Sequence, residues 1–272
     1  VVVGSVSNNF FSKVIGAIEN EAAARGYSLL ICSTHENPKM EMHHLRTLQN
    51  RRVDAIILAS MQEGTMDVDL GLYNSEIPIV YIDSGIPGIP HDLIESANFQ
   101  GTYEATEYLI QLGHRKIGVL ATTFFPTVRQ RLAGYRAAME ANGIPCSEHL
   151  IVDQQPWMEN PGKDMLHELL FLNDDVTALL ILNNNLCDSV LLGLREMKKS
   201  IPDDISLITW DDTALNDLLE ITTIAQFPEL IGKAATHQAI KRIEAEKPET
   251  SEELFIKTLD TELRIRNSCK AI

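Results

Sequence analysis

Basic side chains are scarce in this sequence. Among its 272 residues, 23 Lys and Arg stand against 38 Asp and Glu, which gives a formal net charge of −15 at pH 7. A surface of this charge repels polyphosphate, so the chain alone is a poor candidate for binding nucleic acid, and it would not be drawn to an anionic membrane. No apolar run is long enough to cross a bilayer and no signal-peptide pattern is present, so we expect no membrane partner.

Cysteine is also scarce and widely spaced. The chain has four, none of them in a C-x-x-C pair: Cys32, Cys146, Cys187 and Cys269. This pattern favours free thiols in a reducing compartment over a disulfide framework, and it predicts a cytoplasmic location. His43 and His44, which with His35 could suggest a metal site, are neighbours on a predicted helix and face different ways. We therefore expect no metal site.

The motifs of several enzyme classes are missing. The sequence contains no G-x-G-x-x-G or G-K-[ST] for phosphate binding, and no G-x-S-x-G turn that would present a nucleophilic serine. Asp211 and Asp212 could be interpreted as an acid–base pair, but neighbours on an extended chain point in opposite directions. We expect neither catalysis nor a bound cofactor.

The chain does contain a regular alternation of strand and helix patterns. Val1–Val3 is an apolar run typical of a strand buried on both faces, and apolar residues at helical spacing follow a short polar and aromatic loop, before Gly26. Further strands are predicted at 27–32, 55–59, 77–82, 116–120, 148–153, 178–182, 205–210, 221–226, 255–258 and 261–265. Further helices are predicted at 41–50, 101–112, 132–141, 162–172, from 186 to 198, and at 229–246.

Such alternation predicts an α/β fold with parallel, right-handed winding. The number of strands exceeds what one small parallel sheet holds, so we expect two similar Rossmann-like halves with a ligand cleft between them.

Polar residues recur just after the predicted strand ends. They are Asn8, Asn9, Ser60, Asp83, Asn184, Asn185, Asp211, Asp212 and Gln226. Any one of them could equally cap a helix or shape a turn. Their recurrence predicts a site for a small polar molecule such as a sugar or a nucleobase. Phe10, Phe11 or Trp157 could cover a ring face of that molecule. The planar guanidinium of Arg131 could bind a carboxylate or a pair of hydroxyls.

Seven motifs, in order along the chain, resemble those of one family. They are S-N-N-F-F at 7–11, R-R-V-D-A-I-I-L at 51–58, L-G-H-R-K-I at 112–117, R-L-A-G-Y at 131–135, P-D-D-I-S-L with W-D-D between 202 and 212, T-T-I-A-Q at 222–226, and E-L-R-I-R-N-S at 262–268. Each is weak alone, but the ordered set is specific. The chain resembles the effector-binding core of transcriptional regulators of the lactose-repressor (LacI/GalR) type.

This resemblance implies a fold like that of periplasmic binding proteins, with two subdomains of parallel sheets and three crossings. We expect residues 1–113 plus 228–247 in the first subdomain and 114–227 plus 248–272 in the second. The resemblance also implies a homodimer that senses a sugar-like effector and reaches operator DNA only through an N-terminal helix-turn-helix that this chain lacks. The expected effector contacts, including Ser60 from the strand-end set, are Asn8, Phe11, Ser60, Asp83, Arg131, Trp157, Asn184, Asp211 and Gln226.

Four positions depart from the family pattern. Asn9 replaces proline in S-N-P-F-F, Ser84 stands where many members have arginine, Asn185 replaces the aspartate of an N-D pair, and Ala97 replaces the aspartate of V-D-N. They leave the particular effector open. Two other functions also remain open at this point: a solute-binding protein that delivers sugar to a transporter, and a sugar-processing enzyme that uses Asp211.

Overall fold

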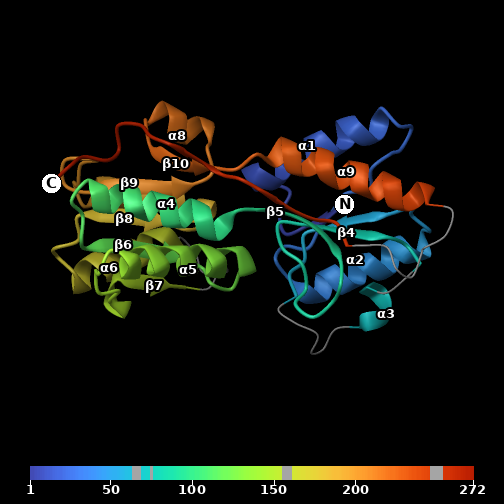
Figure 1. Cartoon of the computed structure of the whole chain (residues 1–272), viewed down its shortest axis with the longest axis horizontal. Helices are drawn as coiled ribbons and strands as arrows, with labels where there is room; N and C mark the ends of the chain where they lie inside the picture. Colours follow the sequence, from blue (N-terminus) through green and yellow to red (C-terminus); the bar gives the residue numbers. More distant parts are fainter. Residues whose placement is uncertain (63–68, 74–75, 155–160, 246–253) are drawn as a thin grey trace. The chain divides into compact units, whose positions relative to one another are not determined.

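The structure is a computed structural model that describes residues 1–62, 69–73, 76–154, 161–245 and 254–272. The chain divides into two compact units (Figure 1). The first comprises Val1–Ser96 and Phe227–Leu259, and the second Ala97–Gln226 and Asp260–Ile272. Each unit has its own six-stranded sheet in the described part of the chain, so the predicted class of two α/β units is confirmed.

The sheet of the first unit is parallel throughout, in the order β11-β5-β4-β3-β1-β2. Its strands are β1 (Val2–Val3), β2 (Cys32–Ser33), β3 (Ile56–Leu58), β4 (Ile79–Ile82), β5 (Asp92–Ser96) and β11 (Ile256–Leu259). Its helices are α1 (Asn9–Ala23), α2 (Pro38–Asn50), α3 (Leu70–Tyr73) and α9 (Pro228–Glu244).

Helices cover both faces of this sheet. Val3 and Ile57 pack with α1 and α9 in one core cluster, whereas their neighbours Val2 and Ile56 pack with α2 in another. Successive residues of a strand point to opposite faces, so both faces bury apolar side chains. This is why these strands have continuous apolar sequences instead of an apolar–polar alternation.

The sheet of the second unit has the order β12-β10-β9-β8-β6-β7. Its strands are β6 (Ile117–Ala121), β7 (Ile151–Asp153), β8 (Ala178–Ile181), β9 (Ser206–Trp210), β10 (Thr222–Ala225) and β12 (Glu262–Arg264). Its helices are α4 (Asn98–Gln111), α5 (Pro126–Ala141), α6 (Pro161–Leu172), α7 (Cys187–Glu196) and α8 (Ala214–Leu218), with 3₁₀ turns at Glu148–Leu150 and Asn184–Leu186. The β12 strand runs antiparallel to β10, so the prediction of parallel winding is wrong for this strand.

Two helix pairs sandwich this second sheet. α4 and α5 cover one face and α6 and α7 the other. The glycine of the R-L-A-G-Y motif explains how closely α4 and α5 approach: a Cβ at Gly134 would lie 2.2 Å from the carbonyl oxygen of Phe99. A side chain at this position would therefore push the two helices apart.

The two sheets share one strand order. From the edge inward, β2-β1-β3-β4-β5 of the first unit corresponds to β7-β6-β8-β9-β10 of the second. In such open parallel sheets, ligands bind beyond the carboxyl ends of the strands. The polar residues identified in the sequence follow these ends in both units.

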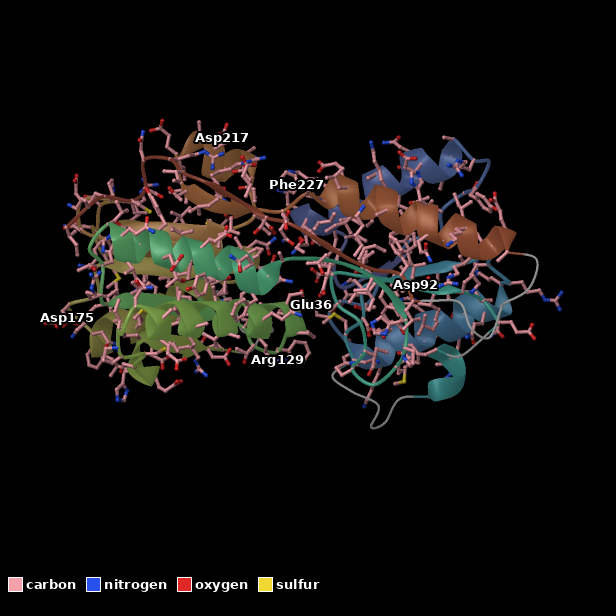
Figure 2. All side chains as sticks on the ribbon, in the orientation of Figure 1. Glu36, Asp92, Arg129, Asp175, Asp217 and Phe227 are labelled. Carbon is pink, nitrogen blue, oxygen red and sulfur yellow. The ribbon has the colours of Figure 1, made fainter. Side chains whose placement is uncertain are left out.

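Several elements differ from the sequence prediction, among them the short helix α3, which was not predicted. The β5 strand was not predicted because its buried positions include Asp92 and Ser96, which break the apolar pattern, and the short helix α8 was also not predicted. Asp92, labelled in Figure 2, is held by an ion pair with Arg242. A strand was expected at 27–32, but only Cys32 and Ser33 pair with β1.

The unit boundaries also differ from the expected ones at two crossings. We expected crossings near Gly113, Phe227 and Lys247, whereas the units divide after Ser96, Gln226 and Leu259. The whole of α4 belongs to the second unit because it packs on α5, and β11 belongs to the first because it pairs with β5. Among the described residues, no helix combines the length and apolar character that a membrane crossing needs.

Candidate functional site

Three of the predicted contacts meet at the carboxyl ends of β8, β9 and β10. The carboxylate of Asp211 accepts hydrogen bonds from the side-chain amide of Asn184 and, at 2.6 Å, from Nε2 of Gln226. Asp211 is only 8% exposed. The other end of the Gln226 amide, Oε1, is buried and has no hydrogen-bond partner among the described residues. This cluster therefore gathers a buried carboxylate with two amide donors, next to one amide oxygen that has no partner among the described residues.

Arg131 lies in the same unit and is fixed by its surroundings. Its Nε donates to Oδ1 of Asn98 at 2.8 Å and its Nη1 to the carbonyl of Leu182 at 2.9 Å. Its guanidinium carbon lies 3.7 Å from the ring centroid of Trp210, a cation–π arrangement. Trp210 directly precedes Asp211, so Arg131 packs on the strand that leads into the acceptor cluster.

Asp83 and Asp211 occupy equivalent places in the two units. Each directly follows its unit's third strand from the β11 or β12 edge, and each has a left-handed backbone, with φ 64° and 67°. The amide of Asp83 donates to the carbonyl of Ile94 at 2.9 Å, and that of Asp211 to the carbonyl of Ile224 at 3.0 Å. For a residue other than glycine this conformation costs roughly 1–3 kcal/mol and is concentrated at functional sites. The strain singles out these two aspartates among the predicted contacts.

Asn8 and Phe11 form the first strand-end loop. The side-chain oxygen of Asn8 caps α1 by accepting hydrogen bonds from the amides of Phe10 and Phe11 at 2.9 and 3.4 Å. The rings of Phe10 and Phe11 meet edge to face, with centroids 5.2 Å apart. Asn8 thus has the capping role that its residue type alone also allowed.

Ser60 faces the interior of its unit. Its hydroxyl donates to Oε1 of the buried Glu41 at 2.9 Å, and the hydroxyl of Tyr73 donates to the same oxygen at 2.9 Å. Burial raises the pKa of the Glu41 carboxyl, although hydrogen bonds from Met61, Tyr73 and Ser60 act in the opposite direction. Ser84, the residue that replaces the family's arginine, donates to the carbonyl of Ser60 at 3.1 Å. Ser60 therefore anchors its loop through its side chain.

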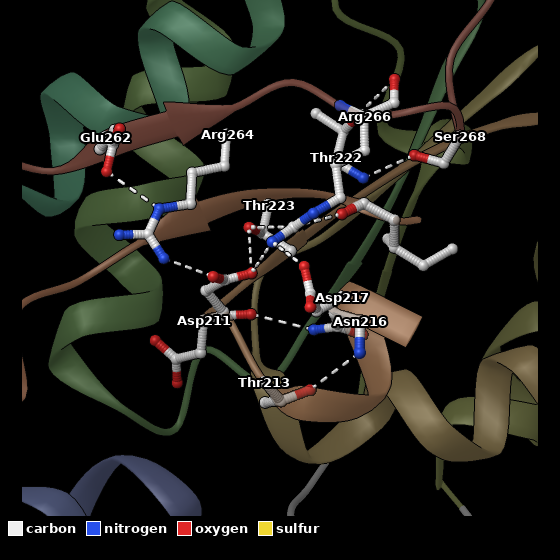
Figure 3. A network of polar contacts seen from close by, with 12 residues as sticks. Asp211, Thr213, Asn216, Asp217, Thr222, Thr223, Glu262, Arg264, Arg266 and Ser268 are labelled. Carbon is white, nitrogen blue, oxygen red and sulfur yellow. Dashed lines mark hydrogen bonds and ion pairs between the residues drawn. The ribbon is translucent and has the colours of Figure 1, made fainter. Parts of the chain in front are cut away.

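Asp212 points away from its neighbour, as expected for adjacent residues. Its carboxylate accepts from Arg264, from Nη2 of Arg266 at 2.8 Å and from the hydroxyl of Thr223 at 3.0 Å. Figure 3 shows the Asp211 side chain directed away from the guanidinium groups of Arg264 and Arg266. The Asp211-Asp212 pair therefore has two separate environments, and the two carboxylates do not flank a common bond as a glycosidase pair would.

The sequence did not predict three residues that build this site. Asn98 and Trp210 hold Arg131, and Asn183 donates to the hydroxyl of Thr122 at 2.6 Å beside the ends of β6 and β8. Asn98 could have been found from the V-D-N motif, and Asn183 from its place at the start of the Asn183–Asn185 run. The predicted contact Trp157 lies outside the described residues.

The described residues show free cysteines and no metal cluster. Cys32, Cys146, Cys187 and Cys269 form no disulfide. In the part of the chain that the structure describes, no three His, Cys, Asp or Glu side chains gather as a metal site requires. His114 is buried and bonds to Thr177 and to the carbonyl of Lys270, so it has a structural role.

Comparison with known proteins is consistent with this geometry. The family model described as periplasmic binding proteins and sugar binding domain of LacI family matches residues 1–262. The chain is similar to the HTH-type transcriptional regulator DegA of Bacillus subtilis (31% identity; 98% of this chain and 79% of DegA). It is also similar to the HTH-type transcriptional repressor PurR of Haemophilus influenzae (29% identity; 100% and 81%).

Among solved structures, a LacI family transcriptional regulator from Enterococcus faecium with bound ribose superimposes with a TM-score of 0.86 at 26% identity, covering 100% of this chain and 98% of that one. The paired sheets thus define a periplasmic-binding-protein-like fold. Within that class, the chain belongs to the LacI family of transcriptional regulators, of which it is the ligand-binding core.

Proposed function

We propose that this chain senses a sugar or sugar-like effector through the strand ends described above and passes that information to operator DNA. DNA contact would come from a helix-turn-helix preceding this chain, since the chain itself is strongly acidic. The proposed contacts are Asn8, Phe11, Asp83, Arg131, Trp157, Asn184, Asp211 and Gln226, with Ser60 acting through the loop that it anchors. We place this function in the cytoplasm, without catalysis or a cofactor.

The acceptor cluster around Asp211 is the observation that carries the proposal. The buried Gln226 Oε1 has no hydrogen-bond partner among the described residues and can accept from a donor, beside the Asp211 carboxylate to which Gln226 and Asn184 donate. Vicinal hydroxyls of a sugar supply two donors at short spacing. An effector acts only through its different affinity for the two regulatory states, so the contacts that distinguish those states would be made here. The regulator relatives, and ribose in one structural neighbour, favour this function over transport.

A thermal-shift screen tests the proposal. D-ribose, other monosaccharides, their phosphates, cellobiose and nucleobases are each added to the chain, and a native-state ligand raises the melting temperature by mass action. The matched variants are Asp211→Asn, in the cluster, and Asp217→Asn, whose side chain is 74% exposed on α8. Asparagine tolerates the left-handed backbone, so Asp211→Asn preserves the turn.

The expected result is an upward shift with at least one sugar-like compound in the wild type and in Asp217→Asn, and its loss in Asp211→Asn. A hydrogen bond to a charged group is worth about 1.5–3 kcal/mol, so the affinity falls about tenfold to about 150-fold. An equal shift in all three proteins would place the ligand elsewhere. If chromatography shows that the protein consumes the bound sugar, this result would favour the enzyme alternative.

We also propose that the chain associates as a homodimer. Exposed leucines on α7 and α8, namely Leu192, Leu215 and Leu218, supply apolar surface on the second unit. Sedimentation analysis is expected to give twice the chain mass, and Leu218→Glu is expected to weaken the association. A wild-type protein that sediments as a monomer at high concentration would contradict the dimer.

A further inference from the structure

Asp212 is the centre of an ion-pair network around β12, and the proposed effector contacts do not account for it. Arg264 and Arg266 both donate to its carboxylate, and Arg266 also donates to the carbonyl of Ile221 at 2.8 Å and to Oδ1 of Asp217 at 3.1 Å. Partial burial alone would raise the pKa of the Asp212 carboxyl, but hydrogen bonds from Arg264, Arg266 and Thr223 hold it below its ordinary value. The carboxylate is therefore ionised and fixed.

The backbone beside this network is strained. Asp211 has φ 67°, a conformation that persists only where the surroundings impose it. Its amide is held by the carbonyl of Ile224 at 3.0 Å, and its own carbonyl accepts from Nδ2 of Asn216 at 3.0 Å. The next residue, Asp212, is held by the two arginines. Figure 3 shows the bond between Asn216 and the Asp211 backbone, and the Asp211 side chain directed away from the guanidinium groups of Arg264 and Arg266.

The two sides of this turn touch two different connecting segments. Gln226, bonded to Asp211, is the last residue of the second unit before the chain passes to the first. Arg264 and Arg266, bonded to Asp212, follow shortly after the chain re-enters the second unit at Asp260. One dipeptide thus joins the acceptor cluster to the segment that contains β12.

We propose that Asp212 is a positioning residue for the effector site: its pairing with Arg264 and Arg266 holds the turn that aims the Asp211 carboxylate at Asn184 and Gln226. This inference rests on the proposed function, because it assigns Asp211 to effector binding. Asp212 itself does not contact the effector.

The chain offers a matched pair of variants. Asp212→Asn keeps the size of the side chain and removes the charge that holds both arginines. Asp217→Asn removes another carboxylate from the same arginine, Arg266, but Asp217 is 74% exposed and does not adjoin Asp211. Figure 2 shows Asp217 at the outer edge of the ribbon of the second unit. A role limited to surface charge would affect the two variants alike.

The first experiment needs no ligand. In isotope-labelled protein, the φ-dependent coupling constant of Asp211 and the exchange rate of the Gln226 side-chain amide protons are measured by NMR. In Asp212→Asn we expect a changed coupling constant and faster exchange, because the turn relaxes and the hydrogen bond from Gln226 to Asp211 opens. In Asp217→Asn both values stay as in the wild type. Wild-type values for both in Asp212→Asn would overturn the proposal.

The second experiment measures D-ribose binding by calorimetry, with melting temperatures recorded for each variant. We expect Asp212→Asn to weaken binding by about tenfold or more and Asp217→Asn by less than about twofold. Because Asp212 acts through Asp211, adding Asp212→Asn to Asp211→Asn should weaken binding by no more than about a further twofold. A merely structural role predicts that the two losses multiply, and that result would overturn the proposal.

The two experiments separate this inference from the proposed function. If wild-type protein binds neither D-ribose nor another compound of the screen, the proposed function fails, while the NMR measurement still decides whether Asp212 sets the Asp211 turn. If D-ribose binds but the two losses multiply, the function stands and the positioning role falls.

Discussion

The ion pair between Asp92 and Arg242 gives the sharpest stability prediction. Asp92 lies on β5 with its side chain 5% exposed, and Arg242 lies on α9 with 17% exposed. Nε and Nη2 of Arg242 each donate to a different carboxylate oxygen at 2.8 Å. Gln238 of α9 adds a bond of 2.8 Å, and the amide of Phe255, next to β11, adds one of 2.9 Å. The carboxylate therefore joins β5, α9 and the start of β11.

Arg242→Ala removes the cation and leaves the buried charge of Asp92 behind. Breaking one partner of a buried pair costs about 3–5 kcal/mol, a large share of the roughly 5–15 kcal/mol that stabilises a domain. With a urea m-value of about 2 kcal/mol/M, the midpoint of unfolding of the first unit should fall by about 2 M. The assay is urea unfolding followed by circular dichroism.

Arg46→Ala is the matched control because it breaks an arginine–carboxylate pair of the same unit at the surface. Arg46 and Asp69 are 57% and 49% exposed, with 3.2 Å between Nη2 and Oδ2. Such pairs contribute about 1 kcal/mol or less, so this midpoint should move by about 0.5 M at most. Equal midpoints for Arg242→Ala and Arg46→Ala would refute the reasoning that burial makes the Asp92 pair structurally essential.

Three further predictions concern pH, helix packing and thiol reactivity. Partial burial alone would raise the pKa of Asp92, but hydrogen bonds from Arg242, Gln238 and Phe255 lower it. The contribution of Asp92 to the free energy of unfolding is therefore present above the unfolded pKa of about 3.9, and it is lost as pH falls through the folded pKa. The difference in unfolding free energy between wild type and Asp92→Asn should thus shrink below about pH 4, and a constant difference would contradict this. Gly134→Ala should cost about 1–3 kcal/mol in thermal unfolding because its Cβ would meet the Phe99 carbonyl. Gly16→Ala, with nothing within 4 Å, should instead stabilise α1 by about 0.5–1 kcal/mol, and a similar loss in both would argue against close α4–α5 packing. Burial raises the pKa of Cys187 to about 11, so iodoacetamide at neutral pH should leave it unmodified in the folded protein, as peptide mass spectrometry would show.

The local elements of this fold follow from local sequence. Strands buried on both faces need continuous apolar runs. Helices begin at residues whose side chains accept hydrogen bonds from the first backbone amides, as Asn8 and Asn37 do at α1 and α2. These requirements involve only residues that are close together in the sequence. Most elements, and the positions of polar residues after strand ends, could therefore be predicted. The family motifs extended this to the two-unit architecture.

The sequence alone failed where a partner distant in the chain decides the outcome. Asp92 can occupy a buried strand only because Arg242, 150 positions away, neutralises it, and no local pattern reveals that partner. For the same reason, α4 belongs with α5 and not with the strands that precede it. The left-handed turns at Asp83 and Asp211 were likewise not predicted, because only a small share of aspartates adopt that conformation and the residue type does not show which ones do.

The sequence by itself therefore determined which residue types stand at the strand ends, and tertiary structure decided what each of them does. Asp211 and Asp212 are identical in type and adjacent, yet one joins Asn184 and Gln226 while the other binds Arg264 and Arg266. In the same way, Ser60 donates a hydrogen bond to the buried Glu41, which packing brings next to it. The physical reason is that a polar side chain takes its role from the partner that packing brings within hydrogen-bonding distance, and packing joins segments that are far apart in the chain.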